Sequence, residues 1–186
     1  SKVFGSANKN KLAIVGTGSR GIGMYGTSVV AAYSDIVEFV GLCDINPGRV
    51  AYAKQAMKVN CPVYTDFDKM ISETKPDTLI VTTPDATHDQ YVIKGLERGL
   101  RVISEKPLTT DETKCQAILD AEKRTGNNVI VTFNMRYTPF VRQVWEILRS
   151  GEIGDITSVN LNWYLDTSHG ADYFRRWHGE RDKVGT

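Results

Sequence analysis

Two hydrophobic periods alternate along the chain: short apolar, β-branched runs, and longer segments whose apolar residues recur at helical spacing. The apolar runs predict strands at residues 12–15, 37–43, 63–65, 78–82, 101–104 and 129–133. The helical spacing predicts helices at 21–33, 47–59, 67–72 and 86–98, one from a capping box of Thr109 and Glu112, and one from Thr138 to Gly151. Strands without polar alternation are buried on both faces. We therefore expect an α/β fold, a Rossmann-type doubly wound parallel sheet.

The hydrophobic pattern changes after Gly154. Residues 156–165 alternate between apolar and polar side chains, which predicts an amphipathic strand of an antiparallel or mixed sheet. We expect an N-terminal extension at 1–10, a first domain at 11–134, and the beginning of an α+β second domain at 135–186. These last roughly 50 residues are too few for a complete second domain, so we expect the chain to be a fragment.

Composition and charge narrow the range of functions. The 23 basic and 22 acidic residues give a formal charge of +1, so we expect neither nucleic acid nor an anionic membrane as a partner. No apolar run approaches the roughly 18 residues of a membrane-spanning helix. Cys43, Cys61 and Cys115 cannot all pair within the chain, which favours a reducing, cytoplasmic location. A signal segment removed before Ser1 would leave the same sequence. The cysteines and histidines lack metal-ligand spacing, so no metal is expected.

A glycine-rich turn joins the first predicted strand to the first predicted helix. Gly16, Gly18 and Gly21 match the pattern Gly-x-Gly-x-x-Gly. The first glycine permits a tight turn, the second lets the backbone approach a pyrophosphate, and the third lets the helix pack on the strand. The amide hydrogens at the helix N-terminus then face the phosphates. This placement favours a dinucleotide-binding site over an ordinary strand-to-helix turn.

An acidic residue ends the second predicted strand. Asp44 lies about 20 residues beyond the glycines, where a carboxylate binds the adenosine ribose hydroxyls. Its alternative role is a plain cap of the helix that begins at Asn46 and Pro47. A carboxylate about 4 Å from a 2′-phosphate costs up to about 4 kcal/mol at an effective dielectric constant of 20. Arg49 offsets part of this repulsion, so we expect NAD as the cofactor, with NADP as the alternative.

Polar residues also follow the later predicted strands, at what should be the same edge of the sheet: Thr82, Thr83 and Pro84 after the fourth, Glu105, Lys106 and Pro107 after the fifth, Asn134 and Arg136 after the sixth. Ligands of doubly wound sheets bind at this edge. Asp85 is predicted to cap the following helix. His88, in its first turn, either closes over the cofactor or has a local structural role.

The ordered set of motifs resembles one family. Gly16-Thr17-Gly18 with Asp44, then Thr83-Pro84 with His88, then Glu105-Lys106-Pro107 are similar in order and spacing to the Gfo/Idh/MocA family of glucose–fructose oxidoreductases and inositol dehydrogenases. Residues 133–137 and 151–154 resemble that family's domain junction. The similarity covers nearly the whole chain from Lys11 onward.

The resemblance implies an NAD(P)-dependent oxidoreductase that transfers hydride between the nicotinamide and a sugar, cyclitol or related polyol. Lys106 would be the catalytic residue beside the nicotinamide, and Glu105 would orient it or touch the ribose. A solvated loop lysine is the alternative for Lys106. The Lys106–Pro107 peptide bond is expected to be cis. The family's catalytic histidine lies downstream of Thr186, so we expect cofactor binding with little turnover, and homo-oligomers of a full-length form.

The residues expected to bind the cofactor are Gly16, Gly18, Ser19, Arg20, Gly21, Ile22, Asp44, Thr82, Thr83, Pro84, His88, Glu105, Lys106 and Asn134. Those expected to bind substrate are Lys106, Arg136, Trp177 and His178, because residues 175–178 resemble a substrate-side segment of some family members. A surface aromatic and basic patch is the alternative for that segment. Two other functions stay open: an NAD-dependent, redox-assisted glycoside hydrolase and a non-catalytic dinucleotide-binding module.

Overall fold

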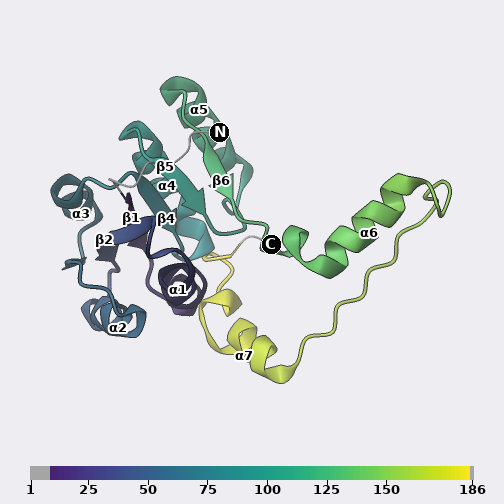
Figure 1. Cartoon of the computed structure of the whole chain (residues 1–186), viewed down its shortest axis with the longest axis horizontal. Coiled ribbons are helices and arrows are strands. Elements are labelled where there is room, and N and C mark those ends of the chain that lie inside the picture. Colours follow the sequence, from purple (N-terminus) through teal and green to yellow (C-terminus); the bar gives the residue numbers. More distant parts are fainter. Residues whose placement is uncertain (1–8, 185–186) are drawn as a thin grey trace.

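A six-stranded parallel sheet organises the chain (Figure 1). The computed structural model describes residues 9–184, so residues 1–8 of the expected N-terminal extension lie outside the described part. The strands are β1 (Asn10–Val15), β2 (Val37–Cys43), β3 (Val63–Tyr64), β4 (Thr78–Val81), β5 (Arg101–Ser104) and β6 (Val129–Val131). Across the sheet the strands lie in the order β3-β2-β1-β4-β5-β6. The first three strands are added toward one side and the last three toward the other, which confirms the predicted Rossmann-type fold.

Helices cover both faces of this sheet. They are a π-helical segment (Gly21–Thr27) that continues as α1 (Ser28–Tyr33), then α2 (Pro47–Met57), α3 (Phe67–Thr74), α4 (His88–Glu97) and α5 (Glu112–Thr125). Side chains of β1 alternate between the two faces. Leu12 and Ile14 belong to the apolar cluster under the π-helical segment and α2, whereas Ala13 and Val15 belong to the cluster under α3, α4 and α5. The fold therefore buries the last four residues of β1, from Leu12 to Val15, and the carboxyl end of the strand carries the glycine-rich turn.

Two predicted helix caps are wrong. The N-cap of α5 is Asp111, whose carboxylate accepts a hydrogen bond from the Lys114 amide at 2.9 Å, and not Thr109. Asp111 directly precedes the first helical residue, so its carboxylate takes the N-cap role that the sequence assigned to Thr109, two positions earlier. Asp85 does not cap α4, because a short 3₁₀ turn (Asp85–Thr87) precedes the helix and Thr87 occupies the N-cap position.

The strand predicted at 156–165 is also wrong. After α6 (Pro139–Ser150) the chain runs without regular structure to α7 (Thr167–Arg175) and a 3₁₀ turn (Trp177–Gly179). Figure 1 shows this connection with no strand beside it. Side-chain alternation favours a strand only where a partner pairs with the backbone, and none of the six strands does so here. Val159 and Leu161 are 83% and 82% exposed as a result.

The sixth strand ends earlier than predicted. It stops at Val131 rather than at residue 133, and the chain enters a 3₁₀ turn at Asn134–Tyr137 before α6 begins. Within residues 9–184, no helix is both long enough and apolar enough to cross a membrane.

Candidate functional site

The glycine-rich turn lies between β1 and the π-helical segment, at the carboxyl edge of the sheet. Gly16 has a φ of +88°, and its amide donates to the Cys43 carbonyl at 2.9 Å. A Cβ at Gly16 would lie 2.6 Å from the Thr82 and Thr83 backbones, and one at Gly21 would lie 2.5 Å from the Gly16 carbonyl. A Cβ at Gly18 would meet no atom within 4 Å. Packing requires the first and third glycines, and the second leaves open space over the backbone.

Asp44, at the end of β2, binds this turn directly. Its Oδ2 accepts hydrogen bonds from the Thr17 amide at 2.8 Å and the Thr17 hydroxyl at 3.1 Å. Its Oδ1 accepts the Asn46 amide at 2.9 Å and lies 3.7 Å from the Arg49 guanidinium. Asp44 is only 4% exposed, whereas the Arg49 side chain is half exposed. The helix α2 is capped by Asn46, so Asp44 holds the glycine-rich turn and is not that helix's N-cap.

A second carboxylate, Glu105, follows β5 and is 5% exposed. Its Oε1 accepts a charge-assisted hydrogen bond from Arg20 Nε at 2.7 Å and one from the Tyr25 hydroxyl at 2.9 Å. Its Oε2 accepts the Lys106 amide at 3.1 Å. Arg20 also donates to Asn134 Oδ1 at 3.1 Å, so one side chain of the glycine-rich turn reaches residues beyond β5 and β6.

Lys106 stands at the same edge with an exposed side chain. The peptide bond to Pro107 is cis, as predicted. Arg136 is exposed after β6 and its guanidinium lies 4.9 Å from the centroid of the Phe133 ring. The structure thus brings Lys106, Glu105, Asn134 and the glycine-rich turn together, and places Arg136 beyond them in the connection to α6.

The segment after β4 packs against the lysine loop through His88. This histidine is fully buried, and its two ring nitrogens lie 2.9 Å from the Thr83 carbonyl and 2.8 Å from the Pro107 carbonyl. Thr82 Oγ1 donates to the Gly16 carbonyl at 2.5 Å. With both ring nitrogens engaged by backbone oxygens, His88 bridges two loops of the site. Direct contact between His88 and a cofactor stays a prediction.

The last described residues return to this edge. The Ala86 amide donates to the Lys183 carbonyl at 3.2 Å, which places the C-terminal segment against the turn after β4. In that segment His178 stacks on Trp177, with ring centroids 3.8 Å apart, and both are partly buried. His178 Nδ1 is buried without a hydrogen-bond partner. Substrate binding by Trp177 and His178 stays a prediction.

Asp85 has a perturbed carboxyl group. Burial raises its pKa above the ordinary value, while the nearby basic side chains of His88, Lys106 and His178 lower it. A carboxyl group with this combination of burial and neighbouring charge is a candidate functional group.

The Asp85→Asn variant is expected to unfold at a higher temperature than the wild type at pH 7. An acid whose folded pKa is raised destabilises the fold when it is ionised, so wild-type stability should fall as pH rises through that pKa. Below about pH 4 the two proteins should have equal unfolding midpoints. Thermal unfolding from pH 3 to 8 tests this, with Asp35→Asn in an exposed turn as the control. A variant less stable than the wild type at pH 7 would contradict it.

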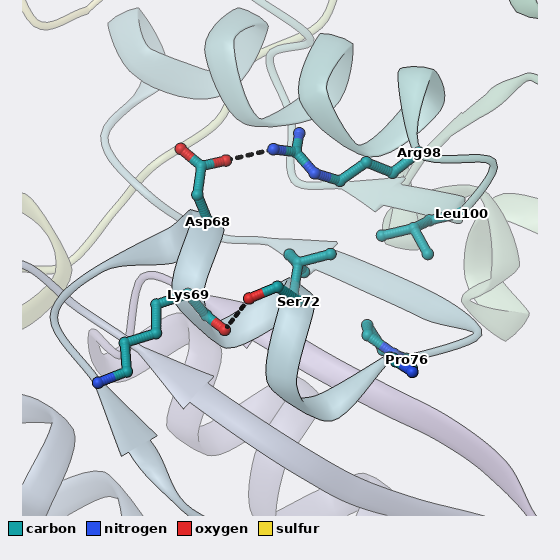
Figure 2. Close-up of a pocket in the computed structure, with 8 residues that line it drawn as sticks. Asp68, Lys69, Ser72, Pro76, Arg98 and Leu100 are labelled. Atoms are coloured by element: carbon teal, nitrogen blue, oxygen red, sulfur yellow. Dashed lines mark hydrogen bonds and ion pairs between the residues drawn. The ribbon is translucent and has the colours of Figure 1, made fainter.

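One hollow on the surface lies away from these residues (Figure 2). It is lined by Asp68, Lys69, Ile71, Ser72, Lys75, Pro76, Arg98 and Leu100. Pro76 lies two residues before β4 and Leu100 lies directly before β5, so the hollow is at the amino edge of the sheet, opposite the glycine-rich turn. Asp68 is already paired with Lys94 at 2.7 Å and Arg98 at 2.5 Å. The hollow contains none of the residues that converge at the carboxyl edge.

Three residues of the site were not expected from the sequence: Thr17, Tyr25 and Thr132. Tyr25 reads as a core residue because it shares a helix face with apolar neighbours, and it is 7% exposed. A buried tyrosine hydroxyl needs a hydrogen-bond partner, which is the signal that could have identified it.

The chain is similar in sequence to NAD-binding oxidoreductases, in agreement with the geometry of the site. The model of an oxidoreductase family with an NAD-binding Rossmann fold matches residues 10–133. The protein YteT of Bacillus subtilis (strain 168) is 38% identical over 178 residues, which cover 94% of this chain and 42% of that protein. Inositol 2-dehydrogenase of Salmonella typhimurium is 29% identical over 148 residues, 77% of this chain and 44% of that enzyme. The chain spans less than half the length of these relatives.

Solved structures share the same fold. The WlbA dehydrogenase of Bordetella pertussis, in complex with NADH and UDP-GlcNAcA, superposes with a TM-score of 0.72 at 24% identity, covering 79% of this chain and 44% of that one. The myo-inositol 2-dehydrogenase of Lactobacillus plantarum gives a TM-score of 0.71 at 25% identity, covering 80% and 43%.

Proposed function

Because the chain belongs to the Gfo/Idh/MocA family of oxidoreductases with an NAD-binding Rossmann fold, we propose that it serves hydride transfer between NAD and a sugar, cyclitol or related polyol. The observation that supports this most is the convergence of the open Gly18 backbone, the buried Asp44 carboxylate and Lys106 at one edge of the sheet. Inositol dehydrogenases among the relatives support the substrate class.

The residues at this edge fit a dinucleotide. The open space over Gly18 would admit a pyrophosphate, and the amides of Gly18, Ser19 and Arg20 precede the first helical turn, where they can face phosphate oxygens. Asp44 would accept from the ribose hydroxyls with Oδ1, which has fewer protein donors than Oδ2. We propose a preference for NAD over NADP because this carboxylate repels a 2′-phosphate.

Lys106 is the proposed acid–base group. When bound, NAD supplies a ring that accepts or returns hydride. The amine form of Lys106 would accept the proton of the substrate hydroxyl during oxidation, and the ammonium form would return that proton during reduction, while Glu105 holds the Lys106 main chain in place. Trp177, His178 and Arg136 are proposed to contact substrate. A homo-oligomer and a cytoplasmic location are also proposals.

In a full-length form of the protein, Lys106→Ala is expected to retain NADH binding and to lower substrate-dependent NADH formation about 10²- to 10⁴-fold, because a positioned proton acceptor is lost. NADH fluorescence titration and assays with inositols, aldoses and polyols measure the two effects. Lys69→Ala is the matched control, since Lys69 is an exposed lysine that lines the hollow at the opposite edge of the sheet. Unchanged turnover in Lys106→Ala would contradict the catalytic role. Release of nitrophenol from nitrophenyl glycosides without net NADH would indicate the hydrolase instead, and binding without either reaction would indicate a binding module.

A further inference from the structure

One hydrogen-bond network joins the glycine-rich turn to the lysine loop. Glu105 Oε1 is shared by Arg20, from the turn, and Tyr25, from the π-helical segment that follows it. The Tyr25 and Thr132 hydroxyl oxygens are 2.5 Å apart, and the Thr132 hydroxyl oxygen also lies 3.1 Å from the Ser104 carbonyl oxygen. The second carboxylate oxygen accepts the Lys106 amide. The network therefore leads from the glycine-rich turn and the π-helical segment, through Glu105, to the main chain of Lys106.

The geometry points to Tyr25 and Arg20 as positioning residues: by holding Glu105, they fix the Lys106 main chain relative to the dinucleotide-binding turn. The inference rests on the proposed function only in that Lys106 acts on substrate. Tyr25 has no assigned contact with substrate or cofactor, so its effect on Lys106 would pass through the Glu105 carboxylate.

The π-helical segment explains how Tyr25 reaches Glu105. A π-helical turn contains more residues than an α-helical one, which changes the direction of the side chains that follow. Gly26 allows this wider segment to pack closely on α2, since a Cβ there would lie 2.6 Å from Met57 Cγ. Such segments occur frequently at functional sites. Here the π-helical segment directs the Tyr25 phenol toward the carboxyl edge of the sheet, while its backbone stays packed on α2.

The protonation state of Tyr25 suits this role. Burial raises the pKa of its phenol to about 12, the neighbouring Glu105 carboxylate adds to that rise, and the hydrogen bond with Thr132 opposes it. The hydroxyl therefore stays protonated at neutral pH and can donate to Glu105 throughout the range in which a dehydrogenase works. Removing it leaves the carboxylate with Arg20, whose side chain is 41% exposed, as its main partner.

The test follows the Lys106 amide itself in Tyr25→Phe. Losing a hydrogen bond to a charged group should raise the hydrogen-exchange rate of that amide about tenfold and move its ¹⁵N–¹H resonance. In the wild type, NADH should slow this exchange further, and Tyr25→Phe should lose that coupling while its NADH affinity changes less than about threefold. Tyr64→Phe is the matched control, because Tyr64 donates to Glu73 at 3.0 Å on the exposed surface. Glu105→Gln should reproduce the exchange effect if Tyr25→Phe fails to fold.

The outcomes separate this inference from the proposed function. Faster Lys106 exchange in Tyr25→Phe but not in Tyr64→Phe, together with loss of the NADH effect, supports it. Unchanged Lys106 exchange in folded Tyr25→Phe, or in Glu105→Gln, overturns it even if NADH binds. If the wild type binds no NADH but Tyr25→Phe still speeds Lys106 exchange, the proposed function fails and the positioning role stands.

Discussion

Gly18→Ala is expected to fold normally and to lose at least about 100-fold in NAD affinity, whereas Gly16→Ala is expected not to fold stably. At Gly18 an added Cβ meets no protein atom within 4 Å, so the methyl group affects only a ligand that approaches the backbone. Keeping a pyrophosphate from its amide partners removes several charge-assisted hydrogen bonds, each about 1.5–3 kcal/mol. At Gly16 a Cβ would lie 2.6 Å from the Thr82 and Thr83 backbones, at a φ of +88°.

The pair is measured by thermal unfolding and NADH titration. Gly23→Ala is the matched control: it lies in the π-helical segment, its Cβ also meets nothing within 4 Å, and we expect unchanged binding. Normal NADH affinity in Gly18→Ala would show that no pyrophosphate approaches this turn. A stable Gly16→Ala protein would show that the described contact between the turn and the end of β4 is wrong.

Asp44→Ala is expected to lower the free energy of unfolding by about 3 kcal/mol and NAD affinity by more than tenfold. The variant leaves the Thr17 amide, the Thr17 hydroxyl and the Asn46 amide without their acceptor in a buried place, and each lost partner costs about 1–3 kcal/mol. The loss of the ribose contact weakens NAD binding. Removing the carboxylate relieves its repulsion of a 2′-phosphate, so the ratio of NADP to NAD affinity should rise.

Urea unfolding and parallel titrations with NADH and NADPH measure these effects. Arg49→Ala is the control, because this half-exposed side chain lies 3.7 Å from Asp44 and should change stability by less than about 1 kcal/mol. Arg49→Ala should weaken NADPH binding more than NADH binding. An Asp44→Ala protein with unchanged stability would refute the buried role of the carboxylate, and an unchanged NADP-to-NAD ratio would refute its role in cofactor choice.

The sheet and the glycine-rich turn could be predicted because local sequence determines them. The apolar strands 37–43 and 101–104 match β2 and β5 closely, since burial on both faces excludes polar alternation. The segment 156–165 shows the limit of this approach. The alternation of apolar and polar side chains in this segment is typical of a strand. A strand forms only when a second strand pairs with it, and the alternation does not supply that partner.

The site was less predictable than the fold because its contacts join distant parts of the chain. Glu105 contacts Arg20 and Tyr25 across 85 and 80 residues, and Asp44 contacts Thr17 across 27. A spacing rule identifies Asp44 and the glycines, since they belong to one local unit of strand, turn and helix. No local pattern indicates that a tyrosine on a helix face holds the carboxylate beside Lys106.

We propose that NAD binds across the glycine-rich turn at the carboxyl edge of the sheet. The most direct measurement is an NADH titration of this chain followed by amide NMR. We expect saturable shifts at residues 16–22, at Asp44 and at residues 82–84, with no shifts around the hollow in Figure 2. Shifts confined to that hollow, or none at millimolar NADH, would contradict it.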